Sequence, residues 1–451
     1  MNVVKKIFFL LLMSEVFMGQ QSNAQLHTTW RFDFGDGPVA NGYLGVSSSD
    51  KFDSAKGYGF HKGPLLISQT RKKTKDPLTA DHITSLQPFY FSVRLPEGNY
   101  DVELLVGDAE NISATLVRAE CRRAMTDLVK TSSSEFKKIR FTVHIKDSLI
   151  RNDGNVIGKV RLKPREHNYA HWDNLLTLEF NGPSPKICAL TIQPNTTATT
   201  IFLAGNSTVV DQDKEPWAAW GQMIPAFFQP EKVVVANYAE SGEALNSFRS
   251  AKRLEKVLSL MKPGDYLFIE FGHNDQKQKG EGVGPWTTYS NDLKSYIKAC
   301  REKGGIPVLI TSMHRRNFDS TGTIQNTLGD YPSAVRKVAQ EEGVALIDLN
   351  AKSKVLYEAW GVVPSLKAFV HFPANTFPGQ DKALADNTHF TTYGAYHIAL
   401  CIAKGIQEAH LPLNKYLKPD LPYEYITQPM HFEDWYWPLS GVKEVVRPDG
   451  N

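Results

Sequence analysis

Five residues in this chain have the types and the order needed to hydrolyse an ester. Ser207 offers a hydroxyl nucleophile, and His389 can take its proton and return it to the leaving alcohol. Asp386 precedes His389 by three residues, so its carboxylate can bond the other imidazole nitrogen and fix the tautomer. The backbone N–H groups of Ser207 and Gly242, with the side-chain amide of Asn274, can form an oxyanion hole. This chemistry requires no cofactor and no metal ion.

A series of apolar runs predicts the β-strands that position these residues, and amphipathic stretches between the runs predict helices. The predicted strands span residues 200–204, 233–239, 266–271, 307–312 and 344–349. The predicted helices span residues 217–228, 245–261, 289–303, 331–342 and 393–409, the last one after a long irregular stretch. This α/β pattern predicts a five-stranded parallel sheet with helices on both faces. Polar residues that follow the strands then converge at one edge of the sheet.

Each of these residues also has a purely structural explanation when it is considered alone. Gly242 can start a helix, and Asn274 can form a turn. Asp386 can cap the last helix, and His389 can be a buried histidine with satisfied hydrogen bonds. Their joint occurrence, in register with the predicted strands, is what favours a catalytic site.

The first part of the chain has a different pattern. Short alternating strands are predicted at residues 30–34, 89–95, 100–106, 139–145 and 175–180. Turns rich in Gly, Asp, Asn and Pro separate them, which predicts an antiparallel β-sandwich. The predicted domains are a signal peptide (1–24), the β-sandwich (25–196), the hydrolase domain (197–415) and a C-terminal extension packed on the domains (416–451).

The amino end predicts export. Lys5 and Lys6 precede the apolar run 7–17, and the small residues 22–24 offer a cleavage site before Gln25. The run is too short to span a bilayer, and no later stretch is apolar enough to do so. We therefore predict a secreted or periplasmic protein that is not held in a membrane. A net charge of +3 gives no indication of a nucleic-acid partner.

The four cysteines Cys121, Cys188, Cys300 and Cys401 are too few and too scattered for a disulfide scaffold or a zinc site. We expect buried free thiols. Export leaves a disulfide within each half, Cys121–Cys188 or Cys300–Cys401, as an open alternative.

Taken together, the segments resemble the SGNH (GDSL-type) hydrolase superfamily, which is named for the residue types found at Ser207, Gly242, Asn274 and His389. The blocks match in order over residues 200–410, and Asp386 completes the Asp-x-x-His pair. The resemblance implies a flavodoxin-like sheet and a serine acyl-enzyme mechanism.

Within this superfamily, residues 203–209, 271–275 and 314–318 look like the rhamnogalacturonan acetylesterases. That likeness implies an acetylated pectic polysaccharide or oligosaccharide as the substrate. Asn206 replaces the usual Asp of Gly-Asp-Ser, which bears on the geometry of the turn and not on the mechanism. Arg315 and Arg316 can bind an acidic sugar through bidentate carboxylate contacts, or they form a solvated surface pair.

Residues 95–102, followed by Gly107 and Asp108, resemble the galactose-binding-like β-sandwiches appended to secreted polysaccharide-degrading enzymes. Related domains often hold a calcium ion. Here Asp33, Asp36 and Asp108 are the only basis for such a site, and we expect them to form turns and to bind no metal.

Two alternatives to a pectin-directed acetylesterase remain. The first is another SGNH esterase that acts on acetylated xylan or on lipid esters, although the loop 277–280 and the segment 314–316 are polar where a lipid enzyme needs an apolar rim. The second is a carbohydrate-binding protein whose hydrolase half is inert, in which replacing Ser207 leaves sugar binding unchanged.

Overall fold

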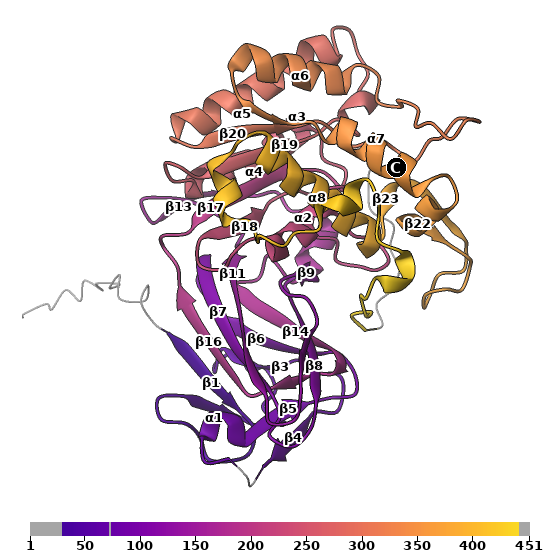
Figure 1. Ribbon diagram of the computed structural model, residues 1–451. Coiled ribbons are helices and arrows are strands. Elements are labelled where there is room, and N and C mark those ends of the chain that lie inside the picture. The colour runs from indigo at the N-terminus through magenta and orange to yellow at the C-terminus, as the bar shows by residue number, and fades with distance from the viewer. Residues whose placement is uncertain (1–28, 72–73, 442–451) are drawn as a thin grey trace, which may run out of the picture.

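The computed structural model describes residues 29–71 and 74–441, and Figure 1 shows two bodies placed end to end. The lower body in this view is a β-sandwich, and the upper body contains a second large sheet and most of the helices. The signal peptide predicted for residues 1–24 lies outside the described residues. Within the described ranges, no helix is both long enough and apolar enough to cross a bilayer.

The sandwich consists of two sheets with the strand orders β11-β7-β16-β1-β2 and β10-β8-β14-β6-β3, and β9 pairs with β8. The first sheet comprises β1 (Trp30–Phe34), β2 (Leu44–Val46), β7 (Gly98–Gly107), β11 (Phe136–Ile145) and β16 (Ala189–Pro194). The second comprises β3 (Tyr58–Phe60), β6 (Phe89–Arg94), β8 (Ser113–Ala119), β9 (Arg123–Ala124), β10 (Val129–Thr131) and β14 (Leu175–Ser184). These pairs are antiparallel except β1 with β2, which is parallel.

Alternating burial explains how the two sheets meet. In β7, Tyr100, Val102 and Leu104 are buried while the residues between them are partly exposed. They pack with Phe91 and Leu178 of the opposite sheet in one hydrophobic cluster. Smaller elements lie at the ends: β4 (Ile67–Thr70), α1 (Pro77–Ala80), β5 (Asp81–Thr84), β12 (Leu149–Asn152), β13 (Asn155–Lys159) and β15 (Lys186–Ile187).

The upper sheet has the order β18-β17-β19-β20-β21, and all its neighbouring strands are parallel. Its strands are β17 (Thr199–Gly205), β18 (Val233–Asn237), β19 (Tyr266–Glu270), β20 (Ile306–Ile310) and β21 (Ala345–Ile347). The five apolar runs of the sequence predict these five strands. Their carboxyl ends lie at one edge, where the loops that follow them can meet.

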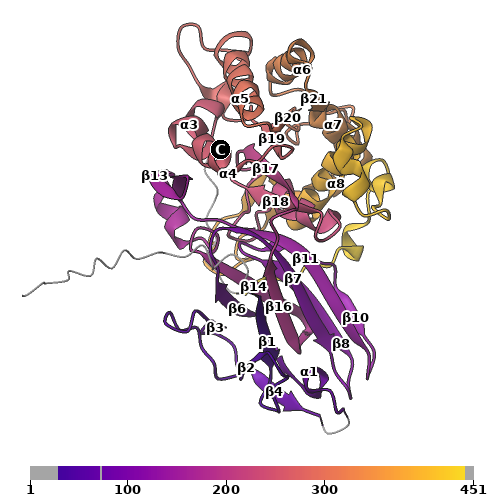
Figure 2. The same ribbon diagram turned by 90° about the vertical axis from the view of Figure 1, so that its left-hand side faces the viewer.

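Neighbouring side chains along these strands belong to separate hydrophobic clusters. Ile201 and Leu203 pack with residues of α2, α7 and α8, whereas Phe202 and Ala204 pack with residues of α3, α4, α5 and α6. Figure 2 shows α3, α4 and α5 on the opposite side of the strands from α7 and α8. The helices are α2 (Trp220–Met223), α3 (Leu245–Ser250), α4 (Arg253–Leu260), α5 (Ser290–Glu302), α6 (Tyr331–Glu342), α7 (Leu349–Trp360) and α8 (Thr392–Glu408).

Two of the predicted helices are wrong in extent. The helix predicted at 245–261 is divided into α3 and α4 because Lys252 adopts a left-handed φ of 62°, which a continuous helix cannot contain. The helix predicted at 217–228 is reduced to α2 and a 3₁₀ turn at Ile224–Phe227, whose second residue is a proline. The helix after Ser207 therefore begins only at Trp220.

The stretch expected to be irregular before the last helix contains regular elements. Helix α7 follows β21 directly, and the side chain of Asp348 caps it by accepting from the backbone N–H of Ala351 (3.2 Å). Strands β22 (Phe369–Phe372) and β23 (Leu384–Phe390) then form an antiparallel pair. Strand β23 carries both Asp386 and His389.

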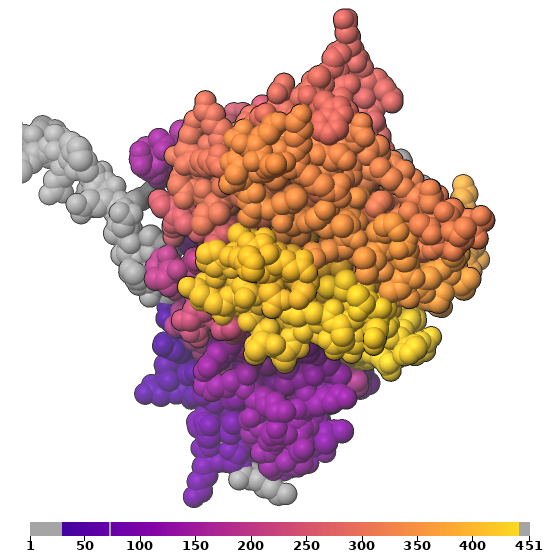
Figure 3. Space-filling model, turned by 45° about the horizontal axis from the view of Figure 1, so that its top comes forward, coloured from indigo at the N-terminus to yellow at the C-terminus, as the bar shows by residue number. Residues whose placement is uncertain are grey.

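The chain beyond α8 contacts both bodies and is seen in yellow between them in Figure 3. Trp435 Nε1 donates to the hydroxyl of Thr392 on α8 (3.1 Å). Arg118 of the sandwich donates to the carbonyl of Pro438 (2.5 Å), and its guanidinium lies 3.9 Å from the ring centroid of Trp437. These contacts tie the two bodies together.

All four cysteines are buried, and Cys188, Cys300 and Cys401 are free thiols. Neither Cys121–Cys188 nor Cys300–Cys401 is therefore a disulfide. The sulfur of Cys300 packs 3.8 Å from that of Met261.

Candidate active site

Ser207 lies just beyond the carboxyl end of β17, in a turn closed by the side chain of Asn206. Asn206 Oδ1 accepts from the backbone N–H of Thr208 (3.0 Å) and from its hydroxyl (2.9 Å). The turn leaves no room for a side chain at position 205, since a Cβ on Gly205 would lie 2.5 Å from a methyl carbon of Val209. The Asn that replaces the usual Asp therefore still supplies the oxygen that shapes the turn.

His389 connects Ser207 to Asp386, and all three side chains are buried. His389 Nε2 lies 2.7 Å from Ser207 Oγ, and Nδ1 lies 2.8 Å from Asp386 Oδ2. Burial acts to raise the pKa of Asp386, but the hydrogen bond and the charge of His389 outweigh it and lower the pKa below its ordinary value. An ionised Asp386 accepts from Nδ1–H, so Nε2 is left to accept the proton of Ser207.

Asn387 lies between Asp386 and His389 on β23, and contacts to Asn387 hold this part of the strand in place. The backbone N–H of Arg316 donates to the carbonyl of Asn387 (2.8 Å). Arg316 Nη1 and His371 Nε2 lie 3.3 and 2.9 Å from the side-chain oxygen of Asn387. The remaining Arg316 nitrogens are also bonded, Nε to the hydroxyl of Ser365 (2.9 Å) and Nη2 to the carbonyl of Val362. In this structure Arg316 thus braces β23.

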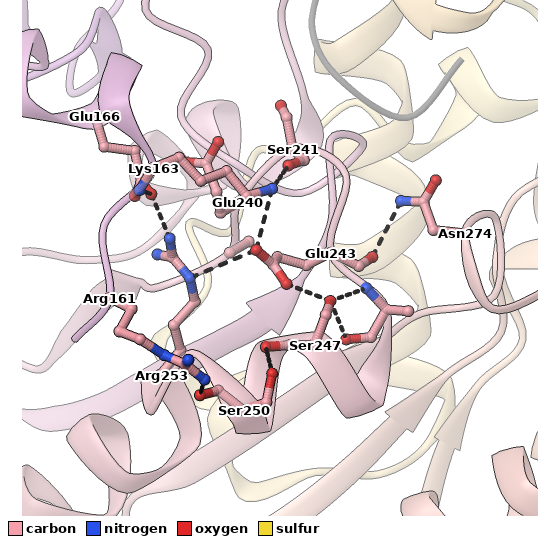
Figure 4. Close-up of polar contacts among 12 residues, drawn as sticks. Arg161, Lys163, Glu166, Glu240, Ser241, Glu243, Ser247, Ser250, Arg253 and Asn274 are labelled. Atoms are coloured by element: carbon pink, nitrogen blue, oxygen red, sulfur yellow. Dashed lines mark hydrogen bonds and ion pairs between the residues drawn. The ribbon is translucent and has the colours of Figure 1, made fainter. Parts of the chain in front are cut away.

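Two of the three predicted oxyanion donors, Gly242 and Asn274, lie in segments that contact each other. Gly242 has a φ of +81°, which favours glycine, and it belongs to the loop 240–243 between β18 and α3. Asn274 follows β19, and its side-chain Nδ2 donates to the carbonyl of Glu243 (3.0 Å), as Figure 4 shows. This bond orients the amide and uses one of its two protons. The structure therefore places Asn274 beside the loop that contains Gly242.

Asp275 links the two segments that contain Gly242 and Asn274. Its two carboxyl oxygens accept from the backbone N–H groups of Leu245 (3.0 Å) and Gly272 (2.9 Å). Burial raises the pKa of Asp275 to about 7. The carboxyl therefore joins the start of α3 to the segment after β19.

Two further buried residues lie near the site and have no role in the predicted mechanism. Glu270, at the end of β19, is buried and accepts from the hydroxyl of Thr208 (2.9 Å), and burial raises its pKa to about 7. His273 is buried, and burial, followed by the positive charges of Arg315 and His389, holds its pKa well below the usual value. A polar residue at the end of an apolar strand was the only signal for Glu270.

Arg315 is half-buried, and its Nη1 lies 3.3 and 3.2 Å from the carbonyl and hydroxyl oxygens of Thr327. The amide oxygen of Gln276, in the orientation that satisfies both of its polar atoms, lies 2.6 Å from Nη2. Both arginines thus have protein partners near the site. Their role as substrate contacts remains a prediction.

The acidic residues considered for calcium do not form a cation site. Asp108 is ion-paired with Arg71 (2.9 Å) and Lys186 (2.5 Å), so its carboxylate already faces two cations. Asp33 accepts from the backbone N–H of Ala40 (2.8 Å). In the part of the chain that the structure describes, no group of three His, Cys, Asp or Glu residues could hold a metal ion.

Comparisons with known proteins match both parts of the chain. The GDSL-like lipase/acylhydrolase family matches residues 203–395, and the β-agarase/YXIM esterase-like, galactose-binding domain-like family matches residues 30–150. Rhamnogalacturonan acetylesterase RhgT of Bacillus subtilis is 45% identical over 219 residues, which cover 48% of this chain and 93% of RhgT. The uncharacterized esterase YxiM of Bacillus subtilis is 28% identical over 353 residues, covering 74% of this chain and 82% of YxiM.

The crystal structure of YxiM aligns with 85% of this chain and 99% of its own, at 24% identity and a TM-score of 0.43. The match to RhgT covers nearly all of that relative, and the resemblance predicted from the sequence motifs is confirmed. With a galactose-binding-like domain at its amino end, this chain belongs to the GDSL-like lipase/acylhydrolase family.

Proposed function

We propose that this protein is a carbohydrate esterase that removes acetyl groups from a pectic polysaccharide of the rhamnogalacturonan type. One observation carries the proposal: Ser207, His389 and Asp386 form a continuous hydrogen-bonded chain with contacts of 2.7 and 2.8 Å. This is the arrangement that activates a serine as a nucleophile. The similarity to RhgT, a rhamnogalacturonan acetylesterase, supports the choice of substrate.

The reaction proceeds in two steps. His389 Nε2 takes the proton of Ser207 while Oγ attacks the acetyl carbonyl carbon, and the oxyanion receives N–H bonds from Ser207, Gly242 and Asn274. His389 returns the proton to the sugar oxygen as the ester bond breaks. A water molecule, deprotonated by His389, then attacks acetyl-Ser207, and His389 returns the proton to Ser207 Oγ as the ester bond breaks and acetate leaves. Asp386 stabilises the imidazolium that forms in each step.

Secretion is part of the proposal, because a polysaccharide outside the cell requires an exported enzyme. The apolar run 7–17 and the small residues 22–24 support it. The galactose-binding-like domain can hold the polymer near the site and so raise its local concentration. Arg315, at the edge of the site, is the residue we assign to the galacturonate carboxylate.

The first test is hydrolysis of p-nitrophenyl acetate by the full mature chain. Ser207→Ala and His389→Ala should each lower kcat by about 10⁴-fold or more, because nucleophile and base act as a unit. Circular dichroism should be unchanged. If the Ser207→Ala variant retained turnover, the serine mechanism would be wrong.

The second test measures acetate released from acetylated rhamnogalacturonan, homogalacturonan, xylan and mannan, with a short-chain lipid ester as a further arm. We expect the highest kcat/KM on rhamnogalacturonan. A preference for xylan or for the lipid ester would replace the substrate while keeping the mechanism. If no acetate were released from any of these substrates while sugar binding stayed intact, the protein would be a carbohydrate-binding protein with an inert hydrolase half.

A further inference from the structure

A segment of the sandwich domain contacts the oxyanion loop directly. Residues 161–172, here called the bridging segment, lie between β13 and β14. Lys163 Nζ donates to the carbonyl of Ser241 (2.5 Å), and Arg165 Nη2 donates to the same oxygen (2.9 Å). Figure 4 shows Lys163 beside Ser241 and Glu243. Two cationic side chains from the other domain therefore converge on one peptide oxygen.

That oxygen belongs to the peptide unit that carries the Gly242 N–H. In a trans peptide the C=O and N–H bonds point in opposite directions within one plane. Fixing the Ser241 carbonyl toward Lys163 and Arg165 therefore fixes the Gly242 N–H on the other side. The φ of Gly242 is +81°, a region where glycine has wide conformational freedom, so an unanchored peptide here could rotate.

The cations are themselves held by carboxylates at the two ends of the loop. Arg165 bonds Glu240 Oε1 through Nε (3.1 Å) and Nη2 (2.5 Å). Lys163 pairs with Glu243 Oε1 (3.1 Å). Since both carboxylates belong to the loop 240–243, these pairs lock its ends as well as its central peptide.

A buried ion pair keeps the bridging segment itself in place. Glu166 pairs with Arg253 of α4, and neither side chain is exposed. Glu166 Oε2 also accepts from the backbone N–H of Lys163 (2.7 Å), and Oε1 accepts from Trp172 Nε1 (3.1 Å). The position of Lys163 is thus set by contacts on both sides of the domain boundary.

We infer that Lys163 and Arg165 of the sandwich domain are positioning residues that orient the Ser241–Gly242 peptide so that its N–H points at the oxyanion. The sandwich domain then contributes to the rate of the chemical step and not only to polymer binding. A cation bonded to the carbonyl also polarises the peptide, which makes its N–H a stronger donor. This inference rests on the proposed ester hydrolysis.

The test replaces the two cations in the full chain with methionine, an unbranched side chain that has no charge and cannot donate. Lys163→Met and Arg165→Met should each lower kcat on p-nitrophenyl acetate by about tenfold and the double variant by about 100-fold, with KM within about threefold. A boronic acid forms a tetrahedral adduct on Ser207, so its inhibition constant should rise by the same factor as kcat/KM falls. Lys163→Arg should restore most of the rate.

Arg161→Met is the matched control. Arg161 lies in the same bridging segment and donates to the carbonyl of Ser250, outside the oxyanion loop. This variant should keep kcat within about twofold. Equal losses in Arg161→Met and Lys163→Met would overturn the inference, because they would reflect general domain docking. Full activity and full boronate affinity in the double variant would also overturn it.

Different results contradict the proposed function and the positioning role. A wild-type chain that does not hydrolyse the ester contradicts the proposed function. An active wild type whose Lys163 and Arg165 variants are equally active contradicts the positioning role alone.

Discussion

The two sides of the proposed active site are held in place by different parts of the molecule. On the proton-transfer side, Asp386 and His389 lie on β23, and their brace, Arg316, comes from the loop after β20 of the parallel sheet. On the oxyanion side, the loop 240–243 receives two of its bonds from Lys163 and Arg165 of the sandwich.

This difference indicates how rate can depend on domain arrangement. The hydrogen bonds that join Ser207, His389 and Asp386 lie within the GDSL-like part of the chain, and the sandwich contacts this side beyond the nucleophile turn, where Arg123 pairs with Asp211 (2.6 Å). We therefore expect a disturbed domain boundary to affect the contact between Ser207 and His389 less than it affects the oxyanion loop. The oxyanion side spans the boundary, and a small displacement there rotates a donor away from the transition state. Displacement of a positioned group by about 1 Å can cost on the order of 100-fold in rate.

Among the variants that compare the two sides of the site, Asp386→Asn should lower kcat the most. An amide in place of the carboxylate favours the wrong imidazole tautomer, and kcat should fall by about 10³- to 10⁴-fold. The measurement is kcat on p-nitrophenyl acetate from pH 5 to pH 9. Because the pKa of Asp386 is lowered, its carboxylate stays ionised throughout this range, and the loss should be similar at every pH.

Thr388→Ala is the control for Asp386→Asn, since Asp386 Oδ1 bonds the backbone of Thr388 and not its side chain. This control should keep nearly full activity. Near-normal turnover of Asp386→Asn would remove Asp386 from the orienting role.

The next effect is expected from Asn274→Ala, on the oxyanion side. Loss of one donor should lower kcat by about 10²- to 10³-fold with a smaller change in KM. Combined with Lys163→Met, the loss should be smaller than the product of the two single losses, because both changes weaken one oxyanion hole. Combined with Asp386→Asn, the Lys163→Met loss should multiply fully. Equal coupling in both pairs would erase the distinction between the two sides.

Much of the proton-transfer side could be predicted from the sequence because its signals are local. The Asp-x-x-His spacing and the apolar run before Ser207 lie within short stretches. The place of Ser207 at the carboxyl edge of the sheet follows once the strands are parallel, whereas His389 lies on β23, which is outside that sheet. The fold class of the hydrolase part follows from the same runs.

The bridging segment could not be predicted in this way. Lys163 caps the short 3₁₀ helix Pro164–Asn168, and Arg165 lies within it. Both side chains bond the carbonyl of Ser241, a backbone group that no residue type marks and that is 78 residues from Lys163 in the sequence. The break between α3 and α4 at Lys252 also could not be predicted. The amphipathic pattern continues across this residue, and only its left-handed φ interrupts the helix. Contacts set by domain docking and by single dihedral angles leave no periodic signal.

Smaller changes in kcat and KM should distinguish the roles of Arg315 and Arg316. Arg316→Ala removes the brace on Asn387, so kcat should fall by about three- to tenfold on both the small ester and the polysaccharide. Arg315→Ala should spare the small ester and raise KM for acidic oligosaccharides by about tenfold through the lost carboxylate contact. The two variants are each other's control. If Arg316→Ala lost activity only on the polysaccharide, Arg316 would be a substrate contact and not a brace.

The smallest effect on activity, and a distinct effect on stability, is expected from Glu270→Gln. Glu270 contacts Thr208 in the turn that holds Ser207 and no reacting atom, so kcat should stay within about threefold. Burial raises its pKa to about 7 from an ordinary 4.5, and the groups facing it are Thr208, Trp220, Ser312 and the nearby carboxyl of Asp275.

Between pH 4.5 and pH 7 the folded chain therefore holds a proton on Glu270 that the unfolded chain has lost. Stability falls as pH rises through this window, by at most about 3 kcal/mol for this group. Gln carries no proton, so Glu270→Gln should have nearly the wild-type free energy of unfolding at pH 5 and a higher one than wild type at pH 8, measured by urea denaturation. A constant difference between the two proteins at both pH values would show that Glu270 does not titrate in this range. The predicted sign would mean that a buried carboxyl of β19 holds the nucleophile turn through Thr208, in addition to the contacts that the sandwich makes beyond that turn through Arg122 and Arg123.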